Sequence, residues 1–290
     1  MSPDKRGQSA MDAFKDKVAI VTGGASGIGR ELGRQLGGHG ATVIVADVNR
    51  EGAEEAASSI AGSTAGRARA APLDVTDDEG VRKLVQNTAA EFGQLDYMFN
   101  NAGIASGGEM RDMDWEHWRR MLDINLMGVI YGSRAAYAVM VEQGFGHIVN
   151  TASGAGLFPI ANSTPYVTTK HGVVGLSRSL RAEGAALGVK VSVVCPAMID
   201  TPIFDAAVYP NLDREKFLAG LPKFLMNDVK SAVKVILRGV SRNRGIIIDS
   251  WYGRFMWWTY RYLPALTHLG NRAVVKGTRE RYRLNPGKDG

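Results

Sequence analysis

The chain has 290 residues, 45% hydrophobic and 22% charged, which is enough to bury the core of one large α/β domain or two small ones. Its single cysteine, Cys195, excludes an internal disulfide and fits the reducing cytoplasm. The net charge of +6 lies entirely in the tail: eight Lys or Arg and two Asp or Glu follow from Ser250 onward, whereas the preceding residues hold 27 of each sign. The basic tail contains no recognisable nucleic-acid-binding motif, so we do not expect the protein to bind nucleic acid. We also find no secretory signal and no run of about 18 uninterrupted apolar residues that would span a membrane.

Short apolar runs alternate with helical patterns along the chain. The expected strands cover residues 17–24, 41–48, 67–75, 95–103, 146–153, 189–197 and 245–250. Such alternation predicts right-handed βαβ units around a parallel sheet. We therefore expect one doubly wound α/β domain of the Rossmann type over residues 15–250. An N-terminal extension (1–14) precedes it, and an amphipathic C-terminal extension (251–290) follows.

The first strand leads into a glycine-rich turn, Thr22 to Gly29, and then into a helix. Glycines at such a turn let backbone N–H groups approach a pyrophosphate, and the helix N-terminus adds partial positive charge. The second strand ends at Asp47, eighteen residues after Gly29. A carboxylate there can accept both ribose hydroxyls and repels a 2′-phosphate, which favours NAD over NADP. Ser26 and Val48 are uncharged, although Arg50 lies close enough to weaken the distinction.

The segment 163–183 predicts a helix that carries Tyr166 and Lys170 on one face, because they are four residues apart. An ammonium group beside a phenol stabilises the phenolate, so the tyrosine can exchange a proton near neutral pH. Ser153 closes a strand thirteen residues before Tyr166, at the sheet edge where ligands bind. Its hydroxyl could hydrogen-bond a substrate oxygen.

These motifs together resemble the short-chain dehydrogenase/reductase family, in its compact branch of about 250 residues. The matching residues are TGGASGIG at 22–29, Asp47, Asp74, NNAG at 100–103, Asn125, Ser153 and YVTTK at 166–170. The resemblance implies that Tyr166 is the general acid/base, Lys170 lowers its pKa and holds the nicotinamide ribose, and Ser153 orients the substrate oxygen. Asn125 would hold a water that links Lys170 to solvent, with a helix-kink role as the alternative.

The resemblance also implies a set of cofactor-binding positions. They are Gly23, Ser26, Gly27, Ile28, Gly29, Asp47, Asp74, Val75, Asn101, Ala102, Gly103, Tyr166, Lys170, Pro196, Ile199 and Thr201. Asp74 and Val75 would flank the adenine, and Thr201 would reach the carboxamide. The sequence departs from the family at Pro196-Ala197, where a glycine usually follows the proline. Alanine disfavours positive φ there.

Residues 198–225 form the expected substrate loop, which in this family closes over the substrate. Its apolar residues (Met198, Ile199, Phe204, Val208, Phe217 and Phe224) favour a hydrophobic alcohol or ketone, although they could equally cover the core. The leading hypothesis is an NAD-dependent alcohol dehydrogenase or ketone reductase. A β-ketoacyl-thioester reductase using NADPH and a non-catalytic binding or scaffold protein are the alternatives. The five histidines lack paired ligand spacing, so we expect no metal site.

The stretch 250–264, SWYGRFMWWTYRYLP, carries three of the five tryptophans. On a helical projection Trp251, Phe255, Trp258 and Tyr262 form one stripe, and Pro264 should end or kink the helix. An exposed aromatic stripe predicts a contact surface. The expected partner is a second subunit in a homodimer or homotetramer, with a peripheral membrane contact through 251–270 or a substrate lid as alternatives. We therefore expect a cytoplasmic protein that could lie at a membrane surface.

Overall fold

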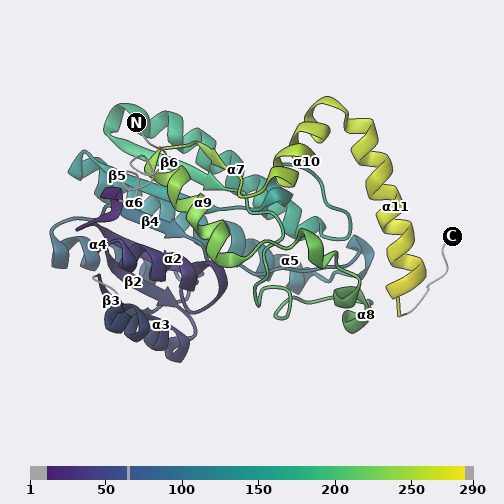
Figure 1. The fold of residues 1–290 in the computed structure, drawn as a ribbon, viewed down its shortest axis with the longest axis horizontal. Coiled ribbons are helices and arrows are strands. Elements are labelled where there is room, and N and C mark those ends of the chain that lie inside the picture. Colours follow the sequence, from purple (N-terminus) through teal and green to yellow (C-terminus); the bar gives the residue numbers. More distant parts are fainter. Residues whose placement is uncertain (1–11, 64–65, 285–290) are drawn as a thin grey trace.

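The computed structural model describes residues 12–63 and 66–284, so most of the predicted N-terminal extension and the last six residues lie outside this range. Within the described residues, seven parallel strands form one sheet in the order β3-β2-β1-β4-β5-β6-β7 (Figure 1). They are β1 (Val18–Thr22), β2 (Thr42–Asp47), β3 (Arg67–Pro72), β4 (Tyr97–Asn100), β5 (Gly146–Thr151), β6 (Val189–Val194) and β7 (Ile246–Ile247). The prediction of a doubly wound parallel sheet is confirmed.

Helices cover both faces of the sheet. One face packs against α2 (Gly27–Gly38), α3 (Arg50–Ser63) and α9 (Val229–Ser241), and the other against α4 (Asp78–Phe92), α6 (Gly128–Gln143) and α7 (Thr164–Gly184). Alternate strand residues supply the two cores, because successive side chains of a strand point to opposite faces. Val21 and Val43 pack in the core beneath α2, whereas Ile20 and Ile44 pack in the core with α4.

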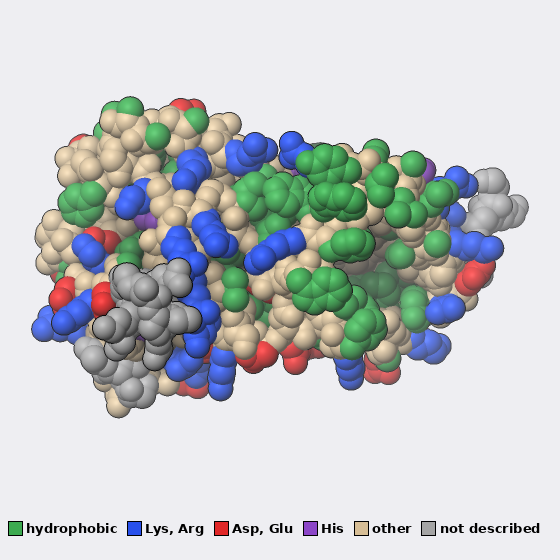
Figure 2. All heavy atoms as spheres, turned by 45° about the horizontal axis from the view of Figure 1, so that its top comes forward, with side chains coloured by type: hydrophobic (Ala, Val, Ile, Leu, Met, Phe, Trp, Pro, Cys, Tyr) green, Lys and Arg blue, Asp and Glu red, His purple; other side chains and the backbone are tan. Residues whose placement is uncertain are grey.

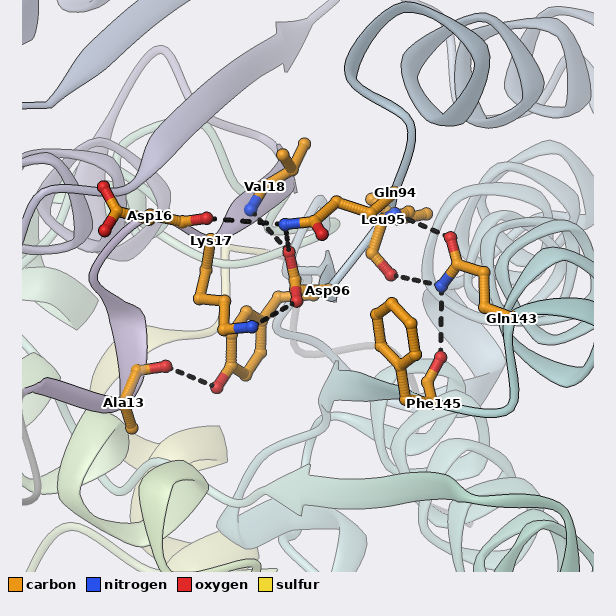
Figure 3. Close-up of polar contacts among 10 residues, drawn as sticks. Ala13, Asp16, Lys17, Val18, Gln94, Leu95, Asp96, Gln143 and Phe145 are labelled. Atoms are coloured by element: carbon orange, nitrogen blue, oxygen red, sulfur yellow. Dashed lines mark hydrogen bonds and ion pairs between the residues drawn. The ribbon is translucent and has the colours of Figure 1, made fainter.

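A polar cluster centred on Asp96 ties the amino ends of the central strands together (Figure 3). The Asp96 carboxylate accepts hydrogen bonds from the Val18 backbone N–H (2.9 Å) and from the Gln94 side-chain amide (2.8 Å). It also forms an ion pair with Lys17, whose Nζ lies 3.0 Å away. Gln143, at the end of α6, pairs with the Leu95 backbone through both ends of its amide. The cluster lies at the sheet edge opposite the carboxyl ends of the strands.

The chain continues past β7 as two helices, α10 (Trp251–Tyr262) and α11 (Pro264–Tyr282), which lie at one end of the molecule (Figure 1). The Ser250 hydroxyl caps α10 by accepting a hydrogen bond from Gly253 N–H (3.0 Å). Pro264 occupies the first turn of α11, so the predicted helix break is confirmed. Trp257 packs against the core cluster that contains Val173 and Ile248, and this contact attaches α10 to the rest of the fold.

One helical stretch, Trp115–Gln143, is long and apolar enough by length and composition to cross a membrane. It comprises α5 (Trp115–Leu122), a π-helical turn (Asp123–Met127) and α6. Val129, Ala136 and Met140 of this stretch are buried in the cores of the domain. The stretch therefore serves here as a flanking helix of the sheet.

Candidate active site

The turn between β1 and α2 has the backbone form that its glycines predict. Gly23 and Gly27 adopt positive φ (65° and 51°), a region that favours glycine. A Cβ at Gly29 would collide with the Gly23 carbonyl oxygen, so helix and turn can only pack this closely without a side chain. Ser26 is the N-cap of α2, yet its side chain makes no capping hydrogen bond. The first N–H groups of a twelve-residue helix are thus left for an anion, which fits a dinucleotide pyrophosphate.

Asp47 ends β2 beside this turn. One carboxylate oxygen accepts a hydrogen bond from Ala25 N–H (3.0 Å) and the other from Asn49 N–H (2.9 Å), so the side chain is fixed against the glycine turn. The neighbouring Val48 is 75% exposed. Arg50 pairs with Glu54 one turn along α3 (2.8 Å). Arg50, the basic side chain nearest to Asp47 in the sequence, thus has a carboxylate partner, in a surface pair of the kind that contributes little free energy.

The carboxyl ends of β1 and β4 are joined by Thr22, whose hydroxyl oxygen accepts hydrogen bonds from the backbone N–H groups of Asn101 (2.9 Å) and Ala102 (3.1 Å). The Asn101 amide also donates to the Thr22 carbonyl and accepts from Thr151, so it connects three strand ends. Its side chain thus has a structural task that the sequence did not reveal.

Two other predicted cofactor positions lie just after β3. The exposed Asp74 caps its own turn by accepting from Thr76 N–H (2.9 Å). Val75 lies against Gly128, where a Cβ would be only 2.9 Å from the valine side chain. The contact positions Val75 at the start of α6, beside the carboxyl edge of the sheet.

The structure brings Ser153, Tyr166 and Lys170 together. Ser153 follows β5, and its hydroxyl forms a hydrogen bond with Tyr166. It also accepts from Ala155 N–H (3.2 Å), which caps a short 3-10 turn and fixes the serine side chain. Lys170 Nζ lies 5.6 Å from the centre of the Tyr166 ring and donates to the Thr151 carbonyl (3.0 Å). All three groups therefore meet at the carboxyl end of β5.

Burial dominates the electrostatics of this group. It raises the pKa of Tyr166 above 10, and the hydrogen bond with Ser153 opposes that rise. It also lowers the pKa of Lys170 to about 8, because the ammonium form loses solvation. Nearby, burial raises the pKa of the Cys195 thiol to about 12, which keeps it protonated and fits a core residue rather than a nucleophile.

Asn125 is fully buried in the π-helical turn between α5 and α6. Its amide oxygen accepts from Ile104 N–H (2.8 Å) and its amide nitrogen donates to the Ile104 carbonyl (2.9 Å), so it clamps the loop after β4. A Cβ at Gly103 would lie 3.1 Å from the Asn125 oxygen and 3.4 Å from Lys170 Nζ. Asn125 thus lies in a π-helical turn and close to Lys170, and π-helical turns are frequent at functional sites.

The Pro196-Ala197 departure has a structural reason. Ala197 does not adopt positive φ, and its N–H donates to Asp249 (2.8 Å). Its methyl lies beside Gly253 of α10, so the C-terminal extension packs on the position where the family usually has glycine. Further along, Ile199 is buried and Thr201 lies against Gly27. Asp249 had no motif or spacing that could have identified it in the sequence.

The sequence-predicted cofactor and catalytic residues thus lie at or near the carboxyl ends of β1 to β6, where open α/β sheets bind ligands. Among the residues that the structure describes, no group of three or more His, Cys, Asp or Glu could hold a metal ion. A glycine turn that fits a dinucleotide, followed by a Ser, Tyr and Lys cluster, defines a nucleotide-dependent oxidoreductase.

Comparison with known proteins identifies the family. The short chain dehydrogenase family model matches residues 17–209, and the chain belongs to this family of oxidoreductases. It is 41% identical over 193 residues to cis-4-hydroxycyclohexanecarboxylate dehydrogenase of Sinomonas cyclohexanicum, covering 66% of this chain and 77% of the relative. An uncharacterized oxidoreductase of Staphylococcus aureus (strain USA300) is 36% identical over 206 residues, which are 71% of this chain and 87% of the relative.

Two solved structures share the fold. A short chain dehydrogenase/reductase from Burkholderia phymatum in complex with NAD has a TM-score of 0.75 at 25% identity, covering 88% of this chain and 96% of the other. Levodione reductase has a TM-score of 0.70 at 28% identity, covering 81% and 96%.

Proposed function

We propose that this enzyme transfers a hydride between NAD and a hydrophobic secondary alcohol or its ketone, with Tyr166 as general acid/base. The observation that carries the proposal is the meeting of Ser153, Tyr166 and Lys170 at the carboxyl end of β5. The nicotinamide, when bound, supplies the hydride acceptor or donor. The domain limits (15–250 and 251–290) and a cytoplasmic location remain part of the same proposal.

Each residue of the group has a task that follows from its surroundings. In alcohol oxidation, the Tyr166 phenolate takes the hydroxyl proton; in ketone reduction, the phenol returns it to the oxygen. The Ser153 hydroxyl donates a hydrogen bond to the substrate oxygen, where negative charge develops. The Lys170 ammonium, held by the Thr151 carbonyl, stabilises the phenolate form of Tyr166. Asn125 fixes the loop after β4 and holds a water that links Lys170 to solvent, and the proton moves through that water.

A cyclic alcohol is supported by one similar protein, whose name specifies a hydroxycyclohexanecarboxylate. The predicted substrate loop has no single long helix and contains α8 (Arg214–Ala219). Its Phe217 packs on Tyr209 (5.2 Å between ring centres) and on Tyr282 of α11 (5.7 Å). These ring contacts join the loop to α11.

Replacement of Tyr166 by phenylalanine tests the mechanism. Tyr166→Phe removes the proton-exchanging hydroxyl and leaves the ring, so we expect kcat to fall by at least about 100-fold while NAD binding stays within about twofold. The assay is steady-state turnover over a panel of cyclic alcohols and ketones, with NAD affinity measured by calorimetry. Tyr137→Phe, at a partly buried tyrosine of α6 that packs in the core away from the cluster, is the matched control. Turnover of the Tyr166→Phe variant equal to wild type would refute the assignment.

Asp47 tests the cofactor preference. Because its carboxylate would face the ribose hydroxyls and repel a 2′-phosphate, Asp47→Asn should lower the NAD to NADP ratio of kcat/KM by about tenfold, which corresponds to ~1.4 kcal/mol. The asparagine retains an oxygen for the Ala25 N–H, so the turn should keep its form. A wild-type enzyme with higher kcat/KM for NADP would contradict the proposal and favour the thioester-reductase alternative.

A further inference from the structure

The C-terminal hairpin presents an apolar surface that its own chain does not cover. We define the hairpin face as the exposed side chains of α10 and the first turns of α11: Trp251, Phe255, Trp258, Tyr262, Leu263, Leu266 and Leu269. Trp251 is 77% exposed and Leu269 59%. The rings of Trp258 and Tyr262 lie 5.5 Å apart, so the stripe forms a joined aromatic patch. Figure 2 shows hydrophobic side chains gathered over the half of the molecule that carries α10 and α11, with Lys and Arg side chains around them.

The hairpin is held in place, so this exposure is built into the fold. Trp257 anchors α10 in the core, and the Arg254 guanidinium donates to the Ile248 carbonyl (3.1 Å). The inner side of α11 is attached to the domain: Asn271 hydrogen-bonds the Pro159 carbonyl (3.1 Å), and Arg279 forms a two-bond ion pair with Glu109 (2.8 Å each). The remaining side of each helix therefore points outward and cannot fold inward.

The charge around the face has one sign. Residues 250–279 contain five Lys or Arg and no Asp or Glu; of these, Lys276 is paired with Glu280 and Arg279 with Glu109. Arg261 and Arg272 are exposed and make no ion pair within the described residues. A twofold contact between two copies would set this basic patch against itself. Like charges brought together in that way cost free energy, so self-association is the poorer match.

We propose that the hairpin face binds the surface of an anionic lipid bilayer. Tryptophan and tyrosine favour the region between lipid headgroups and acyl chains, and arginine pairs with lipid phosphates. Two helices that present Trp, Tyr and Leu outward and only cations beside them match such a surface in both polarity and charge. The face lies in the extension and contains none of the residues to which we give a catalytic role.

Co-sedimentation of the full chain with vesicles tests this proposal. We expect strong binding to vesicles of equal phosphatidylcholine and phosphatidylglycerol, and at least about tenfold weaker binding to pure phosphatidylcholine. Binding to the anionic vesicles should weaken in 0.5 M salt, where charges are screened within about 4 Å. No preference for the anionic vesicles would overturn the proposal.

Variants separate the face from the rest of the surface. Trp258→Ser with Leu266→Ser should lower partition onto anionic vesicles by about tenfold or more, and Arg261→Gln with Arg272→Gln should remove most of the preference for anionic lipid. Leu187→Ser, at a 46% exposed leucine outside the hairpin, is the control and should bind as wild type. Light scattering and vesicle-free turnover accompany each variant. If the Trp258→Ser, Leu266→Ser variant instead dissociated a dimer and left lipid binding unchanged, the hairpin face would be a contact between two copies of the chain, and the proposal would be wrong.

Discussion

Tyr166 and Lys170 lie one helical turn apart on α7, and burial moves their pKa values in opposite directions. It raises that of the phenol and lowers that of the ammonium to about 8, because each shift favours the neutral form. Because the pKa of Lys170 stays above 7, the lysine is mostly protonated at neutral pH and supplies positive charge beside the tyrosine. The hydrogen bond with Ser153 opposes the rise in the pKa of Tyr166, and the Lys170 ammonium, whose Nζ lies 5.6 Å from the ring centre, also favours the phenolate.

His147 on β5 provides a pH-dependent test of stability. Its ring is buried beside the Ser192 hydroxyl (2.8 Å), and burial lowers its pKa from 6.5 to about 3. Between these values the unfolded chain binds a proton that the folded chain does not, so stability decreases as the pH falls through that window. One such proton contributes a slope of up to ~1.4 kcal/mol per pH unit.

We expect His147→Gln to flatten the loss of unfolding free energy between pH 6.5 and pH 4.5, as measured by urea denaturation at several pH values. The variant also loses some stability at pH 7.5, since its packing differs. His268→Gln, at an exposed position, should keep the wild-type slope. An unchanged slope in the His147 variant would show that other groups cause the acid sensitivity.

At the scale of elements, α11 contacts several loops around the candidate substrate site and fixes their positions. Asn271 holds the 159–161 segment between Ser153 and Tyr166, accepting from Ala161 N–H (3.4 Å) and donating to the Pro159 carbonyl. Arg279 holds Glu109 of the loop before α5, and the Tyr282 carbonyl accepts from Asp213 N–H (2.7 Å) before α8. One helix outside the family match thus sets the positions of three loops.

Asn271→Ala should therefore alter substrate handling more than cofactor binding. Losing two hydrogen bonds frees the 159–161 segment at a cost of about 1–2 kcal/mol. We expect kcat/KM for the preferred cyclic alcohol to fall about five- to tenfold, with NAD affinity unchanged. Val274→Ala, on the exposed side of α11, is the matched control. Equal losses in NAD affinity and turnover would point to general unfolding and not to a local role of Asn271 in fixing the 159–161 segment.

At the scale of the whole molecule, the two ends of the parallel strands have different roles. The candidate active site lies at the carboxyl ends of the strands, and the Asp96 cluster lies at their amino ends. Asp96→Asn removes the ion pair with Lys17 and weakens the hydrogen bond to Val18 N–H, both at a buried carboxylate. We expect a loss of about 2 kcal/mol of unfolding free energy with unchanged kcat at 25 °C.

Denaturant unfolding and turnover on the same samples check this separation. Glu91→Gln breaks the half-exposed pair with Arg69 and should cost under about 0.5 kcal/mol, because surface ion pairs contribute little. A large drop in kcat for the Asp96 variant would mean that the two ends of the strands are coupled.

The predictability of this molecule follows from how far apart its contacts lie in the sequence. The strands were predictable because each apolar run is a local pattern. The last strand is shorter than the predicted 245–250, since β7 covers only Ile246–Ile247. It lies at the edge of the sheet, where it pairs with β6, and Ser250 caps α10 three residues later. The Tyr166 and Lys170 pair was predictable because four residues make one helical turn. Asn271 was not, since its partner Pro159 lies 112 residues away and no pattern links them.

Three of the five tryptophans belong to α10, and two of these, Trp251 and Trp258, are exposed on the hairpin face. Three of the five tryptophans therefore report on this one helix, and the other two, Trp115 and Trp118, lie on α5. Transfer of Trp251 and Trp258 into a less polar medium would shift their emission to shorter wavelength. The emission wavelength of Trp257, which packs against the core, would not change. The enzyme thus carries a native optical probe at the surface whose environment matters most.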